Sequence, residues 1–99
     1  MDAQKVAVVT GGMGGLGEAI CHKLSRSGYR VVTTYSPGND HAATWLQEQK
    51  AQGFDFSAYM IDVANFASCE AGVKKIISDI GRIDILVNNA GRAIHEKLD

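Results

Sequence analysis

The chain lacks an excess of either charge and has no long apolar run. Ten lysines and arginines stand against eleven acidic residues, and the basic residues are scattered rather than gathered into a stripe. We therefore expect neither nucleic acid nor a membrane as a partner. No apolar run has the length that spans a bilayer, and residues 1–5 lead into an apolar strand without a signal-peptide pattern. These absences predict a cytoplasmic protein.

The sequence is also poor in cysteine. Its two cysteines, Cys21 and Cys69, form no CxxC pair and have no metal-ligand spacing. We expect both to be small buried side chains in a reducing compartment, and we expect no metal site. Repeats, linkers and low-complexity segments are absent as well, so the 99 residues are predicted to form one small α/β unit.

What the chain does contain is an alternation of short apolar runs with longer stretches of helical spacing. The short runs lie at residues 6–10, 31–35, 56–61 and 83–88. This alternation is typical of βαβ units with a parallel sheet. Right-handed crossovers then give the strand order 3-2-1-4. The predicted fold is a Rossmann-type doubly wound parallel sheet, of which residues 1–99 hold the N-terminal half.

Three helices are predicted between these strands, each with one buried apolar stripe. The stripes comprise residues 16, 19, 20 and 24 in the first helix, 42, 45 and 46 in the second, and 73, 76, 77 and 80 in the third. Gly28 is expected just past the end of the first helix, and Asn65 as the N-cap of the third. His22 and His95 are expected to be solvated.

A glycine-rich turn joins the first strand to the first helix, with the sequence Thr10-Gly11-Gly12-Met13-Gly14-Gly15-Leu16-Gly17. A helix N-terminus favours a phosphate, and glycines let a pyrophosphate approach the main chain. Several phosphate-loop registers fit, and the one that includes the threonine is TGxxxGxG. We expect Gly11, Gly15 and Gly17 to form the tight turn, the approach to phosphate and the helix–strand contact. A purely structural glycine turn is the alternative.

A second polar segment, Asn88-Asn89-Ala90-Gly91, closes the fourth strand. Ligands of doubly wound sheets bind at the carboxyl ends of the strands where the winding reverses, and both segments are predicted to lie there. Buried amides need partners, so at least one of the two asparagines is expected to brace neighbouring strands. The convergence of the two segments predicts a nucleotide site.

A TGxxxGxG turn after the first strand with NNAG after the fourth resembles the short-chain dehydrogenase/reductase family. The resemblance covers residues 1–91, and residues 92–99 form an atypical tail in which Arg92 stands where the family usually has isoleucine. It implies a nicotinamide cofactor, with the Asp-Val pair after the third strand against the adenine ring. The implied cofactor-binding residues are Gly11, Met13, Gly14, Gly15, Leu16, Gly17, Tyr35, Ser36, His41, Asp62, Val63, Asn89, Ala90 and Gly91. For Asp62, an exposed loop aspartate is the alternative.

The end of the second strand bears on the choice of cofactor. Enzymes that select NAD hold the ribose hydroxyls with an acidic residue there, whereas NADP enzymes leave the place neutral and supply a cation. Here the strand ends in Tyr35-Ser36, which makes NADP (NADPH) the expected cofactor and NAD the less favoured one. Ser36, Asn39 and His41 are possible contacts of the 2′-phosphate, and Asp40 is as plausibly the N-cap of the second helix.

Within the family, residues 9–17 and 45–56 look like the acetoacetyl-CoA reductases of polyhydroxybutyrate synthesis. That resemblance implies NADPH-dependent reduction of a 3-ketoacyl thioester to the (R)-3-hydroxyacyl thioester by a homotetramer. The 3-oxoacyl-acyl-carrier-protein reductases share all the motifs and stay open as an alternative. The family's catalytic Ser, Tyr and Lys follow NNAG in a half that these 99 residues do not include, so no catalytic residue is assigned and the chain alone is expected to be inactive.

Two function classes outside the reductases remain. A non-catalytic nucleotide-binding or interaction module would also fit a chain without the catalytic triad. A Rossmann-type methyltransferase fits less well, because it would lack the pair of TGxxxGxG and NNAG.

Overall fold

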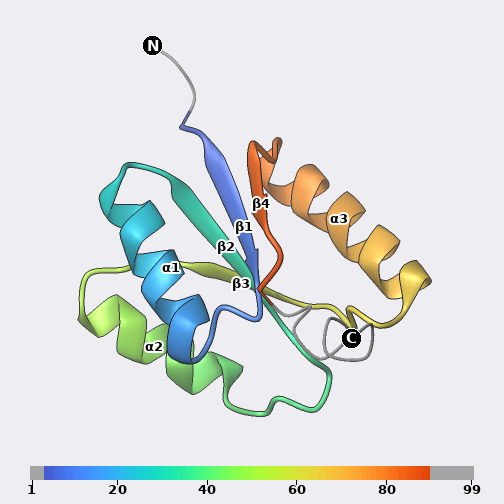
Figure 1. Ribbon diagram of the computed structural model, residues 1–99, viewed down its shortest axis with the longest axis horizontal. Helices are drawn as coiled ribbons and strands as arrows, with labels where there is room; N and C mark the ends of the chain where they lie inside the picture. Colours follow the sequence, from blue (N-terminus) through green and yellow to red (C-terminus); the bar gives the residue numbers. More distant parts are fainter. Residues whose placement is uncertain (1–3, 90–99) are drawn as a thin grey trace, which may run out of the picture.

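The computed structural model describes residues 4–89, which form a four-stranded parallel sheet with helices on both faces (Figure 1). Along the chain the elements are β1 (Val6–Thr10), α1 (Gly15–Arg26), β2 (Arg30–Tyr35), α2 (Ala42–Ala51), β3 (Ser57–Met60), α3 (Phe66–Ile80) and β4 (Ile85–Val87). The strand order is β3-β2-β1-β4, with Val8 of β1 opposite both Val32 and Leu86. The prediction of a doubly wound parallel sheet with order 3-2-1-4 is confirmed.

The two faces of the sheet have separate apolar cores. Neighbouring residues of a strand point to opposite faces, so Val9 packs with Cys21 of α1 and Trp45 of α2, while Val8 packs on the side of Ile76 of α3. Figure 1 shows α1 and α2 on one face and α3 on the other. Trp45 is a core residue, as its helical spacing predicted.

The helix ends follow local sequence signals with one exception. Gly28, just after α1, has a φ of 97°, a backbone conformation that glycine adopts readily. Asn65 caps α3, because its side-chain oxygen accepts from the backbone N–H three residues on at 2.9 Å. At α2 the N-cap position is held by His41 rather than Asp40. The reason is that Asn39 accepts from the His41 N–H at 2.7 Å and turns the chain one residue later.

The buried stripe of α1 differs from the prediction. Leu16 is 71% exposed and Ala19 is exposed, whereas Ile20 and Leu24 pack on the core as predicted, and Gly17 and Cys21 are buried. The two small residues carry a weak hydrophobic signal, yet they allow the helix to approach the sheet closely. The apolar side chain of Leu16 therefore lies outside the core.

His22 is not solvated, contrary to expectation. Its ring is partly buried and stacks on Phe54, with ring centroids 4.1 Å apart and planes 3° from parallel. Its Nε2 lies 2.6 Å from Oε1 of Gln49. Residues of α2 and of the following loop, distant in sequence, supply this environment. His95 lies outside the described residues.

The predicted stripe of α3 is only partly buried. Ile76 is 1% exposed, but Val73 and Ile77 are 42% and 48% exposed. They line an apolar groove of about 490 Å³ between α3 and the sheet, which also reaches Leu86 of β4. Among residues 4–89, α3 is the single helix on this face, so no described element covers the groove.

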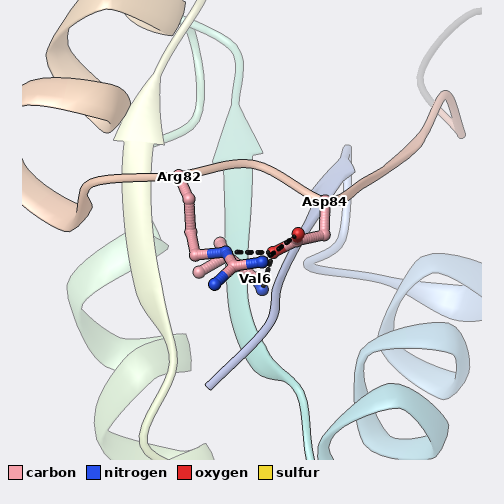
Figure 2. A network of polar contacts seen from close by, with 3 residues as sticks. All are labelled: Val6, Arg82 and Asp84. Atoms are coloured by element: carbon pink, nitrogen blue, oxygen red, sulfur yellow. Dashed lines mark hydrogen bonds and ion pairs between the residues drawn. The ribbon is translucent and has the colours of Figure 1, made fainter. Parts of the chain in front are cut away.

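Two strands are shorter than predicted. β3 covers residues 57–60 rather than 56–61, and β4 covers 85–87 rather than 83–88. Just before β4, the Asp84 carboxylate accepts a hydrogen bond from the Val6 N–H, which in a regular strand pair would go to a backbone carbonyl oxygen. Arg82 donates to the same carboxylate (Figure 2). The regular ladder of β4 therefore begins at Ile85.

Candidate nucleotide-binding cleft

A cleft of about 380 Å³ opens at the carboxyl ends of β1, β2 and β3. It is lined by Gly11, Met13, Gly14, Thr34, Tyr35, Ser36, Asn39, Ile61 and Val63. These residues come from the glycine-rich turn, from the end of β2 with its following loop, and from the end of β3. This is the edge of a doubly wound sheet at which ligands bind. None of the nine lining residues is charged.

The glycine-rich turn shapes one wall of the cleft. Gly11 has a φ of 64°, and its N–H donates to the Thr34 carbonyl oxygen at 3.1 Å, which ties the turn to the end of β2. Gly14 is the N-cap of α1, so no side chain caps the first turn of that helix. A Cβ at Gly15 would meet nothing within 4 Å. The N-terminus of α1 is therefore open to an anionic ligand.

Gly17 forms the close contact that the motif predicted. A Cβ there would lie 2.8 Å from Nδ2 of Asn89 and closer still to the Gly11 carbonyl oxygen. The absent side chain lets α1 pack directly on the turn that precedes it. Two of the roles predicted for the TGxxxGxG glycines therefore have a structural reason: Gly11 forms the tight turn, and Gly17 allows the close contact of the helix.

The reasoning from sequence missed Gly12, which is as tightly enclosed. A Cβ on Gly12 would collide with Thr33 Oγ1 and lie 2.8 Å from Cys21 Sγ. The Gly12 N–H donates to the Thr33 hydroxyl at 2.9 Å, and that hydroxyl donates to the Val9 carbonyl oxygen at 2.9 Å. The sequence shows a glycine at this position but not why one is needed, because its partner Thr33 lies on β2, 21 residues further along the chain.

The end of β4 is braced to β1 by both asparagines, as expected of at least one. Asn89 Nδ2 donates to the Gly11 carbonyl oxygen at 3.0 Å. Asn88 Oδ1 accepts from the Thr10 hydroxyl at 3.2 Å, and that hydroxyl also lies 3.4 Å from the Val87 carbonyl oxygen. The two polar segments of the sequence therefore meet in space.

The loop after β2 forms the opposite wall. The Asn39 N–H donates to the Ser36 carbonyl oxygen at 3.0 Å, and the Asn39 side-chain nitrogen lies 3.8 Å from the Met13 sulfur. This contact joins the loop to the glycine-rich turn. His41 lies outside the cleft, with its Nε2 3.2 Å from an Asp40 oxygen, and lines an adjoining hollow of about 490 Å³.

Asp62 orders the segment after β3. Its Oδ1 accepts from the Ala64 N–H at 3.0 Å, and its own N–H donates to the Ser68 hydroxyl at 2.9 Å. The segment places Val63 in the cleft wall, while Asp62 is not among the lining residues.

Of the cofactor-binding residues expected from the sequence, the cleft wall contains Gly11, Met13, Gly14, Tyr35, Ser36 and Val63. Gly15, Leu16, Gly17, His41, Asp62 and Asn89 lie in the surrounding segments, and Ala90 and Gly91 lie outside the described residues. Thr34 and Ile61 line the cleft but were not expected, although both stand at or next to strand ends.

Within residues 4–89 there is no group of three or more His, Cys, Asp or Glu side chains placed to hold a metal ion. In the same part of the chain, no helix is long and apolar enough to cross a membrane.

Comparison with known proteins gives close relatives. The acetoacetyl-CoA reductase of Cupriavidus necator is 47% identical over 88 residues, which are 89% of this chain and 36% of the relative. Nodulation protein G of Azospirillum brasilense is 52% identical over 89 residues, or 90% of this chain and 36% of that protein. A 3-oxoacyl-[acyl-carrier-protein] reductase of Staphylococcus aureus is 37% identical over 91 residues, or 92% and 37%. The chain thus spans about a third of the length of these relatives.

A solved structure and a family of sequences agree with these relatives. The fold matches the crystal structure of an actinorhodin polyketide ketoreductase variant with NADPH, with a TM-score of 0.77 and 32% identity over 87% of this chain and 33% of that one. Residues 5–99 match the sequence family described as short chain dehydrogenase. The chain therefore belongs to the short-chain dehydrogenase family of oxidoreductases.

Proposed function

We propose that the chain is the NADP-binding part of an acetoacetyl-CoA reductase, which reduces a 3-ketoacyl thioester to the (R)-3-hydroxyacyl thioester with NADPH. Relatives with the name acetoacetyl-CoA reductase, at 40–47% identity over the same segment, support this reaction. The proposal includes the acyl-thioester substrate, a homotetramer and a cytoplasmic location for the whole protein. The hydride comes from the nicotinamide when the cofactor is bound.

The observation that carries the choice of NADPH is the uncharged end of β2. Tyr35 and Ser36 line the cleft where an acidic residue would repel a 2′-phosphate. Ser36 and Asn39 bring hydrogen-bond donors to the same wall. A neutral wall with donors accepts the phosphate, and none of its lining residues is a carboxylate of the kind that selects the free ribose hydroxyls of NADH.

The other parts of the cleft fit the rest of a dinucleotide. The first turn of α1 follows Gly14 and Gly15, where an anion can approach the main chain without meeting a Cβ, so this turn would hold the pyrophosphate. Val63 and the Asp62 segment would hold the adenine ring. Leu16, Gly17, His41 and Asn89, with Ala90 and Gly91, complete the proposed binding residues.

The main alternative is a 3-oxoacyl-acyl-carrier-protein reductase, which the relative from Staphylococcus aureus supports. Both reactions reduce a 3-keto group on a thioester, and they differ in the carrier of the acyl chain. Residues that distinguish the carriers belong to the two thirds of the relatives that this chain does not span. A non-catalytic nucleotide-binding module is the alternative from another class.

Binding measurements test the cofactor preference. We expect the 99-residue chain to bind NADPH more tightly than NADH by calorimetry. Ser36→Asp should reverse the order, with a swing of about tenfold or more in relative affinity, because hydrogen bonds to charged groups are worth about 1.5–3 kcal/mol. Ser78→Asp, an exposed site on α3, is the matched control and should leave the order unchanged. Tighter binding of NADH by the parent would contradict the proposal.

A chimera tests the reductase role. Residues 1–89 replace the corresponding segment of the Cupriavidus necator acetoacetyl-CoA reductase, which supplies the remaining part. A folded chimera should oxidise NADPH in the presence of acetoacetyl-CoA, and the Ser36→Asp version should favour NADH. A folded chimera that binds NADPH without turnover would favour the non-catalytic module.

A further inference from the structure

A polar cluster of Glu18, Trp45, Gln49 and His22 lies between α1 and α2. None of its members makes a cofactor contact in the function proposed above. Glu18, in the first turn of α1, accepts two hydrogen bonds on one carboxylate oxygen, Oε1. The donors are Trp45 Nε1 at 2.7 Å and Gln49 Nε2 at 3.1 Å, one turn apart on α2. Trp45 is 7% exposed and Gln49 is 2% exposed, so these bonds lie within the packed contact between the two helices.

The cluster continues to His22 of α1, and the hydrogen bonds determine which atoms of Gln49 and His22 donate and which accept. The Gln49 amide nitrogen donates to Glu18, so its oxygen is the acceptor that faces His22 Nε2 at 2.6 Å. The imidazole therefore donates from Nε2, and its ring is held by the stack on Phe54. Each polar group of Gln49 thus has a partner, which a nearly buried amide requires.

This cluster connects the two walls of the cleft. Glu18 stands three residues after Gly15, at the end of the glycine-rich turn. Trp45 stands in the first turn of α2, and its backbone N–H donates to the carbonyl oxygen of His41, directly after the loop that holds Ser36 and Asn39, at 2.9 Å. Figure 1 shows α1 and α2 on the same face of the sheet, each beginning near the carboxyl ends of the strands. The residues that line the cleft lie at these strand ends.

We propose that Glu18 is a positioning residue for the dinucleotide, because its hydrogen bond to Trp45 sets the separation between the glycine-rich turn and the loop after β2. The proposal rests on the proposed function, since it concerns the same cleft. The Asn39 side-chain nitrogen and the Met13 sulfur, 3.8 Å apart, bring the two walls into contact across the cleft, and a change in the separation would alter this contact. A ligand that contacts both walls should be sensitive to Glu18, whereas one that contacts only the glycine-rich turn should not.

The experiment compares two ligands that differ in reach. NADPH would span both walls, and inorganic pyrophosphate would contact the glycine-rich turn alone. Glu18→Ala removes the acceptor, and Trp45→Phe removes the indole N–H together with part of the buried ring volume while it keeps an aromatic ring in the core. We expect each variant to weaken NADPH binding by up to about tenfold, the factor that applies if the full energy of the hydrogen bond to the charged group positions the two walls, with pyrophosphate binding changed by less than about twofold.

Three further variants make the result specific. Glu18→Gln keeps an acceptor oxygen and should recover most of the NADPH affinity. The double variant Glu18→Ala with Trp45→Phe should weaken NADPH binding by clearly less than the product of the two single effects, because both single variants remove the same bond. Glu70→Gln, an exposed carboxylate on α3, removes the same charge at a distance and should bind as the parent does.

The fluorescence of Trp45, the single tryptophan of the chain, reports the bond directly, and Glu18→Ala should shift its emission whereas Glu70→Gln should not. Equal weakening of both ligands would show a general loss of structure and overturn the inference. Unchanged NADPH binding in Glu18→Ala and Trp45→Phe would overturn it as well, with the proposed function intact. A parent chain that binds neither NADPH nor NADH would overturn both.

Discussion

Val6 and Asp84 exchange two hydrogen bonds at the end of the sheet opposite the cleft. The Val6 N–H donates to Asp84 Oδ2 at 2.8 Å (Figure 2). In return, the Asp84 N–H donates to the Val6 carbonyl oxygen at 2.8 Å. Arg82 adds two bonds to the same carboxylate, at 2.7 Å and 2.6 Å. The Asp84 side chain therefore reinforces a backbone hydrogen bond that joins β1 to the residue just before β4.

The Asp84 carboxylate should give the chain a specific acid sensitivity. Its pKa is lowered by the hydrogen bonds from Arg82 and then by the backbone N–H of Val6. Since the folded pKa lies below the unfolded value near 3.9, this stabilisation is complete above about pH 4 and is lost as the pH falls through the folded pKa. Asp84→Asn should therefore be less stable than the parent at neutral pH, and the gap should close in acid.

Urea unfolding at a series of pH values measures that gap. Asp55→Asn, an exposed carboxyl in the loop before β3, is the matched control and should follow the parent across the range. A gap between parent and Asp84→Asn that stays constant from neutral pH to pH 3 would contradict the assignment.

Gly12 should be far less tolerant of a side chain than Gly14. Alanine at Gly12 must displace the Thr33 hydroxyl or the Cys21 sulfur in a packed core, and overpacking of this kind costs about 1–3 kcal/mol. Gly14 has an extended backbone and no neighbour within 4 Å of a Cβ, so Gly14→Ala should stay within about 0.5 kcal/mol of the parent. Urea unfolding measures the free energy of unfolding of both alanine variants. Equal values would contradict the tight enclosure of Gly12.

The sequence was sufficient for those features that local patterns encode. The strand order follows from alternating periods and crossover handedness, and the Asn65 cap and Gly28 are signals contained in a few neighbouring residues. The predicted stripe of α1 was wrong at Leu16 and Ala19, which are exposed, because Gly17 and Cys21 occupy the face of the helix that lies closest to the sheet. Their smallness, rather than their hydrophobicity, places them against the sheet.

The parts of the site that sequence could not provide depend on contacts between distant segments. The enclosure of Gly12 depends on Thr33, and the environment of His22 depends on Gln49 and Phe54. Asp40 was a reasonable N-cap by residue type, but the side chain of Asn39 captured the next backbone N–H instead. Tertiary partners of this kind have no fixed spacing in the chain.

The two cysteines should differ in reactivity. They are free thiols on opposite faces of the sheet, and Cys21 is buried as expected, whereas Cys69 is only partly buried, contrary to the expectation for both. Burial raises the pKa of the Cys21 thiol to about 11, with a smaller increase from the charge of Glu18 against a lowering by Thr33. Because the thiolate is the reactive form, a thiol reagent at pH 8 should modify Cys69 first and Cys21 only on unfolding.

Cys69→Ser should therefore abolish the fast phase of thiol titration and leave the slow one. In urea without reductant, the parent should show both thiols. A parent with no titratable thiol under those conditions would contain a disulfide and contradict the two-faced topology.

β4 should make the 99-residue chain prone to self-association. Within the described residues β4 pairs only with β1, so its other edge has no strand partner, and Leu86 at its centre is 64% exposed. An apolar strand with an open edge is a template for pairing with a second copy, and lysine on such an edge opposes it. Leu86→Lys should therefore shift the chain toward monomer in sedimentation across a concentration series.

Phe66→Lys, the same kind of change at an apolar residue that is 81% exposed on α3, is the control and should associate as the parent does. A parent that stays monomeric throughout the series, or equal dissociation by both lysine variants, would show that β4 is not the associating edge.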